Sequence, residues 1–202
     1  MITKRWIRRR GVSMLVALSL CVVGAPVLSG QGVAPTKEQV DDRAAFKQFS
    51  DRVQGYLELR KTVESSLPAL KPTDLPEMIT AHQEASARKI REARPHAVEG
   101  DIFTKAACEA FRRAASAALG GAKSANSRAY MQRDSADALM PLAVNEVYPD
   151  AEPITALSPA LLAAFPALPV EVAYRVVGRA LVLMDVKSRL IVDVARLVLP
   201  PS

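Results

Sequence analysis

One long amphipathic helix constrains this fold more than any other feature of the sequence. Thr36 and Gln39 match a capping box, which predicts a helix that starts at about Lys37. The helix ends near Pro68, because a proline inside a helix removes a backbone hydrogen bond. Its apolar side chains follow an a/d spacing over three heptads, interrupted once at Arg60. This apolar stripe consists of Phe46, Phe49, Val53, Tyr56, Val63 and Leu67.

A stripe of this size has to be buried, and the chain offers a neighbour for it. Asp74 and Glu77 match a second capping box, so a second helix is expected at about 75–94. The seven residues between the two helices are few enough for an antiparallel hairpin. The apolar face of the second helix, which has less bulk than the stripe, consists of Met78, Ile79, Ala85, Ile90 and Ala93. Either a third helix supplies the remaining contacts, or the stripe pairs with a second copy or with a partner helix.

A third helix is expected to start after Thr104 and to end at Leu119, before the glycine pair at 120–121. Its inward face is expected to consist of Ala107, Phe111, Ala114, Ala115 and Ala118. Residues 127–139 fit a fourth and weaker helix.

A proline-rich connection at 141–169 follows the helices. It contains an alternating, extended stretch at 142–148 and one short helical turn at 160–164. The prolines make a long regular element unfavourable in this part of the chain.

The last part of the chain has a β pattern. Apolar side chains alternate over 172–177, and Gly178 with Arg179 matches a two-residue hairpin turn before a return strand at 181–184. A turn at 185–189 leads to a third strand at 190–194, and a helix over 188–198 is the main alternative.

Together these patterns predict an α+β protein, mainly α. An antiparallel helical hairpin or bundle precedes a small C-terminal antiparallel β meander. The expected segments are a signal peptide at 1–34, a helical region at 35–140, the connection at 141–169 and the meander at 170–202, packed on the helices.

The N-terminal residues account for the basic character of the chain. The formal net charge is +6, and the first 30 residues hold five of the 27 basic residues and no acid. The remaining 22 basic and 21 acidic residues nearly cancel, so the net charge does not point to nucleic acid. Basic residues 4–10 precede an uncharged stretch at 11–29, which is typical of a secretory signal. We expect a periplasmic or secreted protein, with an uncleaved inner-membrane anchor as the alternative.

The segment Tyr174–Val194 resembles the C-terminal part of small periplasmic bacterial proteins. These include uncharacterised exported proteins and the periplasmic nickel/cobalt-homeostasis proteins. The shared features are a strand, a glycine turn, a strand that ends near an aspartate, and a third strand rich in Ile and Val. Gly100-Asp101-Ile102-Phe103 and Tyr148-Pro149 also resemble recurrent features of uncharacterised exported proteins. The resemblance implies export and a shared fold, and it implies no activity.

Few side chains suggest chemistry. On one continuous helix His82 and His96 would lie about 21 Å apart, too far to share a metal. Cys108 lies near three basic residues at helical spacing, which favours a lower thiol pKa, but its alanine neighbours favour a packing role. Asp185 and Asp193 flank the third strand and could act as an acid–base pair. More simply, Asp185 starts a turn, and Asp193 should face away from the valines on either side of it.

We therefore expect no catalytic residue, no metal site and no cofactor. The basic residues Arg88, Lys89, Arg91 and Arg94 are expected to form a solvated face, with weak contact to an anionic membrane surface as the alternative. The leading hypothesis is a non-enzymatic binding module that engages an envelope protein, or a second copy, through the apolar stripe. An envelope stress or metal-homeostasis accessory protein is the alternative.

Overall fold

The capping box at Thr36 starts α1 (Lys37–Ser65), as the sequence predicts. The Thr36 hydroxyl accepts a hydrogen bond from the Gln39 N–H at 3.3 Å, and the Gln39 side chain accepts one from the Thr36 N–H at 3.0 Å. The whole apolar stripe faces the interior of the protein. Four of its members, Phe49, Val53, Tyr56 and Val63, are buried. The two end members, Phe46 and Leu67, are half-buried and pack against the same core.

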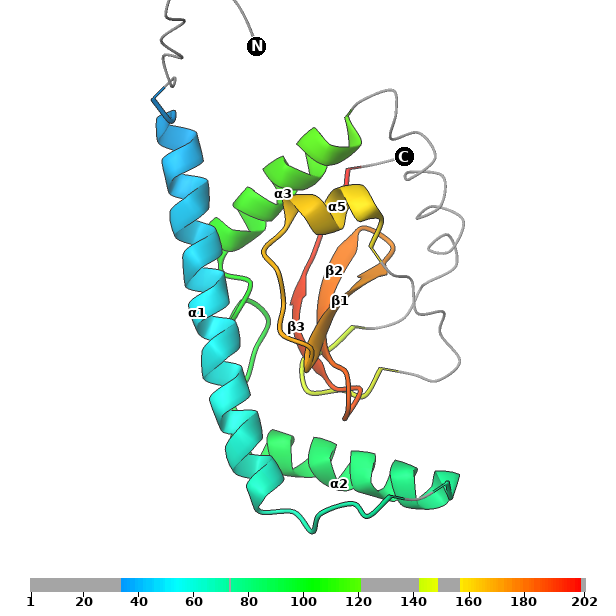
Figure 1. The fold of residues 1–202 in the computed structure, drawn as a ribbon. Coiled ribbons are helices and arrows are strands. Elements are labelled where there is room, and N and C mark those ends of the chain that lie inside the picture. Colours follow the sequence, from blue (N-terminus) through cyan, green and yellow to red (C-terminus); the bar gives the residue numbers. More distant parts are fainter. Residues whose placement is uncertain (1–33, 73, 121–141, 149–156, 201–202) are drawn as a thin grey trace, which may run out of the picture. The chain divides into compact units, whose positions relative to one another are not determined.

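The computed structural model describes residues 34–72, 74–120, 142–148 and 157–200. The expected signal segment up to residue 33, the expected helix at 127–139 and part of the connection lie outside the described residues. The further elements are α2 (Pro76–Ala93), α3 (Lys105–Leu119), α5 (Pro159–Ala164), β1 (Val172–Val177), β2 (Ala180–Asp185) and β3 (Ile191–Ala195). The sheet order is β1-β2-β3, with antiparallel pairs, which confirms the α+β class and the C-terminal meander (Figure 1).

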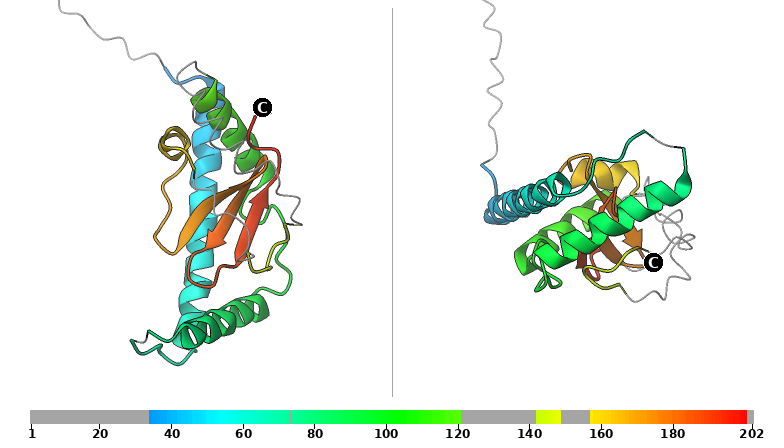
Figure 2. Two further views of the ribbon diagram at one scale, coloured as in Figure 1. Left: turned by 90° about the vertical axis from the view of Figure 1, so that its right-hand side faces the viewer. Right: turned by 90° about the horizontal axis from the view of Figure 1, so that it is seen from below.

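The second helix differs from its prediction in its cap and in its buried face. Leu75, not Asp74, is the N-cap of α2, and its side chain makes no capping hydrogen bond, so the expected capping box at Asp74 is wrong. Of the five residues expected to face the stripe only Ile90 is buried, together with Ser86 and Ala87. The reason is the direction of α2, which crosses the C-terminal end of α1 rather than running along it (Figure 2).

The antiparallel neighbour of α1 is α3, which runs upward in Figure 1 where α1 runs downward. The Thr104 side chain caps α3 as expected, accepting from the Ala107 N–H at 3.2 Å. Phe111, at the centre of α3, contacts the rings of Phe46 and Phe49, with centroid distances of 5.1 and 5.0 Å. The third helix therefore covers the N-terminal part of the stripe, which is one of the alternatives that the sequence left open.

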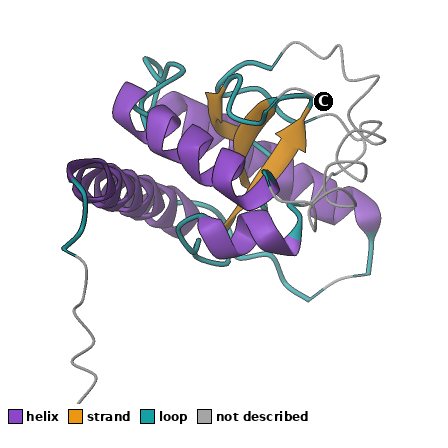
Figure 3. Ribbon diagram, turned by 90° about the horizontal axis from the view of Figure 1, so that it is seen from above, coloured by secondary structure: helices purple, strands orange, loops and turns teal. Residues whose placement is uncertain are grey.

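One face of the sheet packs against α1, α3 and α5 in a single core (Figure 3). The strand residues in this core are Val172, Tyr174, Val176, Leu181, Leu183, Val192 and Ala195, and Leu190, just before β3, joins them. The opposite face packs with Leu142 and Tyr148 in a smaller cluster. Val147 bridges Leu190 next to β3, but a turn at 144–145, with Asn145 at φ 68°, interrupts this stretch, so the extended conformation expected over all of 142–148 is wrong.

The third strand is a strand and not a helix, and it contains an irregularity. Leu183 pairs with Asp193, but the next residue of β2, Met184, pairs with Ile191. This bulge breaks the alternation, since Val192 joins the helix-facing core and Val194 joins the other cluster. The expectation that both valines share a face opposite Asp193 is therefore wrong.

Two glycines offer a matched stability test. Gly178 sits in the hairpin turn at φ 58°, with open space around the position of a Cβ. Gly178→Ala should therefore lower the free energy of unfolding by about 1–2 kcal/mol through backbone strain alone. Gly55 lies at an exposed position in the middle of α1, and the space around the position of a Cβ is open there too. Gly55→Ala should therefore raise the free energy of unfolding by about 0.5–1 kcal/mol. Urea unfolding of both variants measures the two changes in the free energy of unfolding, which should have opposite signs. Changes of the same sign would contradict these backbone assignments.

Candidate functional site

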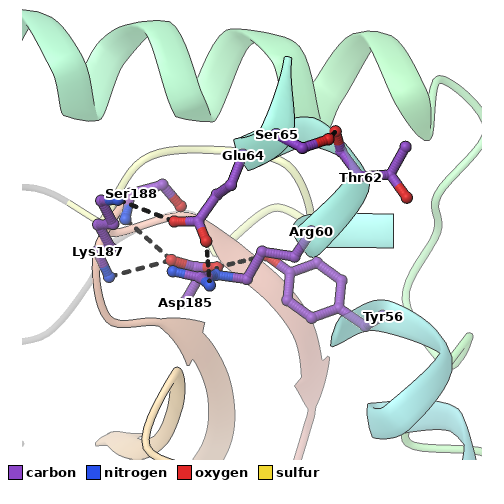
Figure 4. A network of polar contacts seen from close by, with 8 residues as sticks. All are labelled: Tyr56, Arg60, Thr62, Glu64, Ser65, Asp185, Lys187 and Ser188. Atoms are coloured by element: carbon purple, nitrogen blue, oxygen red, sulfur yellow. Dashed lines mark hydrogen bonds and ion pairs between the residues drawn. The ribbon is translucent and has the colours of Figure 1, made fainter. Parts of the chain in front are cut away.

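A buried polar network joins α1 to the end of β2 (Figure 4). Asp185, the last residue of β2, is fully buried and accepts hydrogen bonds at one carboxylate oxygen, Oδ2, from the Tyr56 hydroxyl at 2.9 Å and from Arg60 Nε at 2.6 Å. Its Oδ1 accepts from the backbone N–H groups of Lys187 and Ser188 at 3.0 and 2.9 Å. All the main acceptor positions of this carboxylate are therefore occupied.

The network continues to the surface through alternating charges. Arg60 Nη1 lies 3.0 Å from Glu64 Oε2, and Lys187 Nζ lies 2.9 Å from Glu64 Oε1. Figure 4 shows Glu64 between the two cations. Burial alone lowers the pKa of the Arg60 guanidinium, but Asp185 and Glu64 raise it above its ordinary value. Arg60 therefore stays charged, and its buried partner Asp185 explains its place within the apolar stripe.

The second aspartate, Asp193, fixes the loop between α2 and α3. Its Oδ1 accepts from the N–H groups of Gly100 and Val194 at 2.9 and 2.8 Å, and its Oδ2 accepts from those of Ile102 and Phe103, both at 2.7 Å. Burial raises the pKa of Asp193, and the four backbone donors oppose that shift. Both candidate acid–base residues are thus used to join segments of the fold, and they occupy different networks.

Arg94 links the end of α2 to both the stripe and the sheet. Its guanidinium carbon lies 5.4 Å from the centre of the Tyr56 ring, and its Nη2 donates to the carbonyl oxygen of Val192 at 3.0 Å. Burial lowers the pKa of Arg94. This member of the expected basic face is therefore half-buried, while Arg88, Lys89 and Arg91 are exposed on α2.

The tyrosines of the core give a prediction at alkaline pH. Burial and the charge of Asp185 raise the pKa of Tyr56, and burial raises the pKa of Tyr174. A tyrosine whose pKa is raised in the folded protein stabilises it below the unfolded pKa of about 10, and this contribution is lost as the pH rises further. Tyr56 and Tyr174 should therefore ionise only as the protein unfolds. A titration of tyrosinate absorbance beside circular dichroism measures this, and ionisation of both in the folded protein would contradict it.

The other candidates for chemistry are not brought together. Cys108 is half-buried, and its thiol donates to the Phe103 carbonyl oxygen at 3.2 Å. Burial raises the pKa of this thiol, against the lowering that the neighbouring basic residues suggested. His82 is half-buried on α2 and His96 is exposed beyond its end. Within the described residues, no three His, Cys, Asp or Glu side chains are grouped so that they could hold a metal ion.

An open hollow lies between the N-terminal half of α1 and the first turns of α3. It has a volume of about 940 Å³ and is lined by Lys37, Glu38, Asp41, Ala44, Ala45, Gln48, Ala106, Glu109 and Arg113. The three alanines leave the space, because their side chains are shorter than those around them. Arg113 lies 3.4 Å from Glu38 and also pairs with Asp42. We call this feature the α1–α3 groove.

The charges of the α1–α3 groove are only partly neutralised. Among the described residues, Asp41 and Glu109 form no direct ion pair, whereas Arg113 pairs with Glu38 and Asp42 and also feels the charge of Glu109. Two acidic side chains and Lys37 are therefore available to a ligand, and the groove favours a positively charged group. The sequence gives no direct signal for this groove, since its residues come from helices separated by α2.

No protein-family model, curated protein or solved structure matches the chain. The resemblance of Tyr174–Val194 to periplasmic proteins thus stays a prediction. In the part of the chain that the structure describes, no helix has the length and apolar character needed to cross a membrane.

Proposed function

We propose that this chain is an exported, non-enzymatic interaction module that binds a protein partner of the cell envelope through the α1–α3 groove. The observation that carries this proposal is the groove itself, with its alanine-lined space and its unpaired acids Asp41 and Glu109. The partner is expected to present a basic side chain next to a small or apolar surface. This proposal keeps a helical surface as the binding element but moves it away from the stripe.

The apolar stripe is not the binding surface in this proposal, because its side chains form part of the protein core. Phe49 and Val53 are each 1% exposed, and the stripe contacts α3 and the sheet in the main core. A partner helix could reach these side chains only after the core had opened. The charged side chains that line the groove, by contrast, lie outside the stripe on α1 and on α3.

Export is supported by the sequence of residues 1–34, with basic residues followed by an uncharged stretch. We expect the intact mass of the protein from its native host to correspond to a chain that begins between residues 30 and 35. Such a chain lacks Trp6 and should show tyrosine fluorescence only. A full-length mass in the membrane fraction would instead support the uncleaved anchor.

Two arginine substitutions on α3 test the groove. Ala106 lines the groove, whereas Ala117 is also exposed on α3 but does not line it. Ala106→Arg should fill the hollow and abolish the capture of the native partner from the envelope, while Ala117→Arg should capture it like the unmodified protein. Matching thermal transitions of the three proteins control for folding. If the unmodified protein and both variants capture the same envelope proteins, the groove is not the binding surface.

The alternative function, a metal-homeostasis accessory protein, is supported only by the resemblance of Tyr174–Val194. It requires a bound metal, so titration calorimetry with Ni²⁺, Co²⁺ and Zn²⁺ tests it. We expect no saturable binding with a Kd tighter than about 1 μM, which corresponds to about 8 kcal/mol. Stoichiometric binding in the nanomolar range would favour the alternative.

A weak contact with an anionic membrane surface through α2 is a further possibility, supported by the exposed Arg88, Lys89 and Arg91. Lys89 already pairs with Glu92 at 3.0 Å, and Glu84 lies nearby in the sequence, which reduces the positive field. We therefore place a protein partner first. Nucleic acid is not expected as a partner of an exported chain.

A further inference from the structure

Two exposed arginines hold the segment that follows β3, residues 196–200, which lies beside α3 (Figure 2). Arg112, on α3, donates through its Nε to the Leu197 carbonyl oxygen at 3.2 Å. Arg179, in the hairpin turn between β1 and β2, donates through its Nε to the Leu199 carbonyl oxygen at 3.0 Å. The Leu199 N–H in turn donates to the Arg179 carbonyl oxygen at 3.2 Å. We call these two side chains the arginine pair.

The two backbone hydrogen bonds orient the guanidinium groups of the arginine pair. Each of them uses only its Nε for a partner in the described part of the chain, so both Nη groups of each side chain are left for a ligand. The two carbonyl groups that anchor them belong to residues two positions apart, or at most about 7 Å along an extended chain. The short segment therefore holds both guanidinium groups on one small area of the surface.

The charge of the arginine pair is not neutralised. Among the described residues, no carboxylate forms an ion pair with Arg112 or Arg179, whereas Arg60 and Arg113 each have acidic partners. The neighbouring acids are engaged elsewhere. Glu99 pairs with Arg196 at 2.9 Å, and Glu109, one turn before Arg112 on α3, lines the α1–α3 groove. The area thus carries two positive charges with no counter-charge in direct contact.

The segment that anchors the arginine pair is fixed before any ligand arrives. Leu197 has a φ of 54°, a left-handed conformation that is uncommon for a residue with a side chain. The next two side chains, Val198 and Leu199, are buried in the main core and hold this conformation in place. A ligand therefore does not have to order the backbone, which lowers the entropic cost of binding.

We propose that Arg112 and Arg179 bind a phosphomonoester group, either of a free phosphate ester or of a lipid headgroup. Such a group carries a charge of about −1.5 to −2 at pH 7 and three strong acceptor oxygens. It can balance both arginines, whereas one carboxylate would leave a positive charge over. The planar fork of a guanidinium also matches two oxygens of one phosphate. Neither arginine lines the α1–α3 groove, so this proposal and the proposed function stand or fall independently.

A titration with inorganic phosphate at constant ionic strength gives the first test. Two-dimensional NMR follows the Nε–H signals of the arginines, and those of Arg112 and Arg179 should shift and saturate. Arg88 is the reference, because it is exposed on α2, away from this segment, and its signal should not follow the same curve. Shifts that do not saturate, or that are as large at Arg88, would indicate a general response to the anion and would contradict a free ester as the ligand.

Substitutions identify the groups that bind. Arg112→Gln and Arg179→Gln should each weaken the binding of the anion about tenfold, the factor that 1.4 kcal/mol gives. Arg179→Lys should also weaken it, because lysine keeps the charge but lacks the planar fork. Arg88→Gln is the matched control and should bind like the unmodified protein. Matching thermal transitions of all variants show that they are folded.

Vesicles distinguish the two sources of the phosphomonoester. Sedimentation compares phosphatidylcholine vesicles that contain phosphatidic acid, a phosphomonoester, with vesicles that contain phosphatidylglycerol, a phosphodiester. Preference for phosphatidic acid that both glutamine variants lose would identify a lipid headgroup. Saturable binding of inorganic phosphate without retention on vesicles would identify a free ester. Equal retention on both kinds of vesicle would report surface charge alone and contradict the lipid source. If neither probe binds, or if Arg112→Gln and Arg179→Gln bind like the unmodified protein, the proposal is wrong.

Discussion

Asp185→Ala should lower the free energy of unfolding by about 3–5 kcal/mol, the loss expected when one member of a buried ion pair is removed. The substitution leaves Arg60, whose side chain is 9% exposed, without its partner at 2.6 Å. It also removes the acceptor of the Tyr56 hydroxyl and frees the turn that Asp185 holds through two backbone N–H groups. Urea unfolding monitored by circular dichroism measures the loss.

A double-mutant cycle separates the pair from the rest of the network. Arg60→Met with Asp185→Leu replaces both charges by apolar side chains, so no buried charge is left without a partner. The double variant should lose less free energy of unfolding than the two single variants lose together. Additive losses would contradict the ion pair between α1 and β2. As a surface control, Lys47→Ala breaks an exposed pair with Asp51 and should change stability by less than about 1 kcal/mol.

Phe49→Ala should lower the free energy of unfolding by about 3–5 kcal/mol, as for a buried aromatic residue. Phe49 is 1% exposed, and its ring centre lies 5.1 Å from that of Phe103, 5.0 Å from that of Phe111 and 6.1 Å from that of Tyr174. One side chain of α1 therefore contacts the loop before α3, α3 itself and the sheet. The missing ring leaves a cavity that rigid elements on three sides cannot fill.

The matched control for Phe49 lies on the same helix. Val40 is 49% exposed, and Val40→Ala should change the free energy of unfolding by no more than about 0.5 kcal/mol. Both variants keep α1 helical, so differences in helix propensity stay small. Equal effects at the two positions would contradict the assignment of Phe49 to the core.

Local sequence patterns predicted the elements of this fold well. The Thr36 capping box, the Thr104 cap and the glycine turn at Gly178 act over a few residues, and the elements that they mark formed where these patterns lay. The arrangement of the helices could not be read in the same way. Met78 and Ile79 look like a core face by spacing, yet they are 45% and 38% exposed because α2 crosses the end of α1. A local pattern contains no information on that crossing.

The polar network had one signal in the sequence, which is Arg60 inside an apolar stripe. A charged side chain at a core position requires a partner of opposite charge, and a buried acid could have been expected from this alone. Which acid takes that role depends on the end of β2 meeting α1, more than a hundred residues apart in the sequence. The bulge in β3 was hidden for a similar reason, since it arises from pairing with β2 and from the loop that Asp193 binds.

The apolar stripe of α1 belongs to the interior of this chain, which leaves the proposed binding to other surfaces. Phe49→Asp tests it most directly, with a melting curve and light scattering on the same sample. We predict that this variant loses its cooperative thermal transition, because a charge without a partner is placed among the rings of Phe103, Phe111 and Tyr174. A variant that keeps the transition of the unmodified protein but loses self-association or its partner would contradict the claim and return the stripe to the role of an interface.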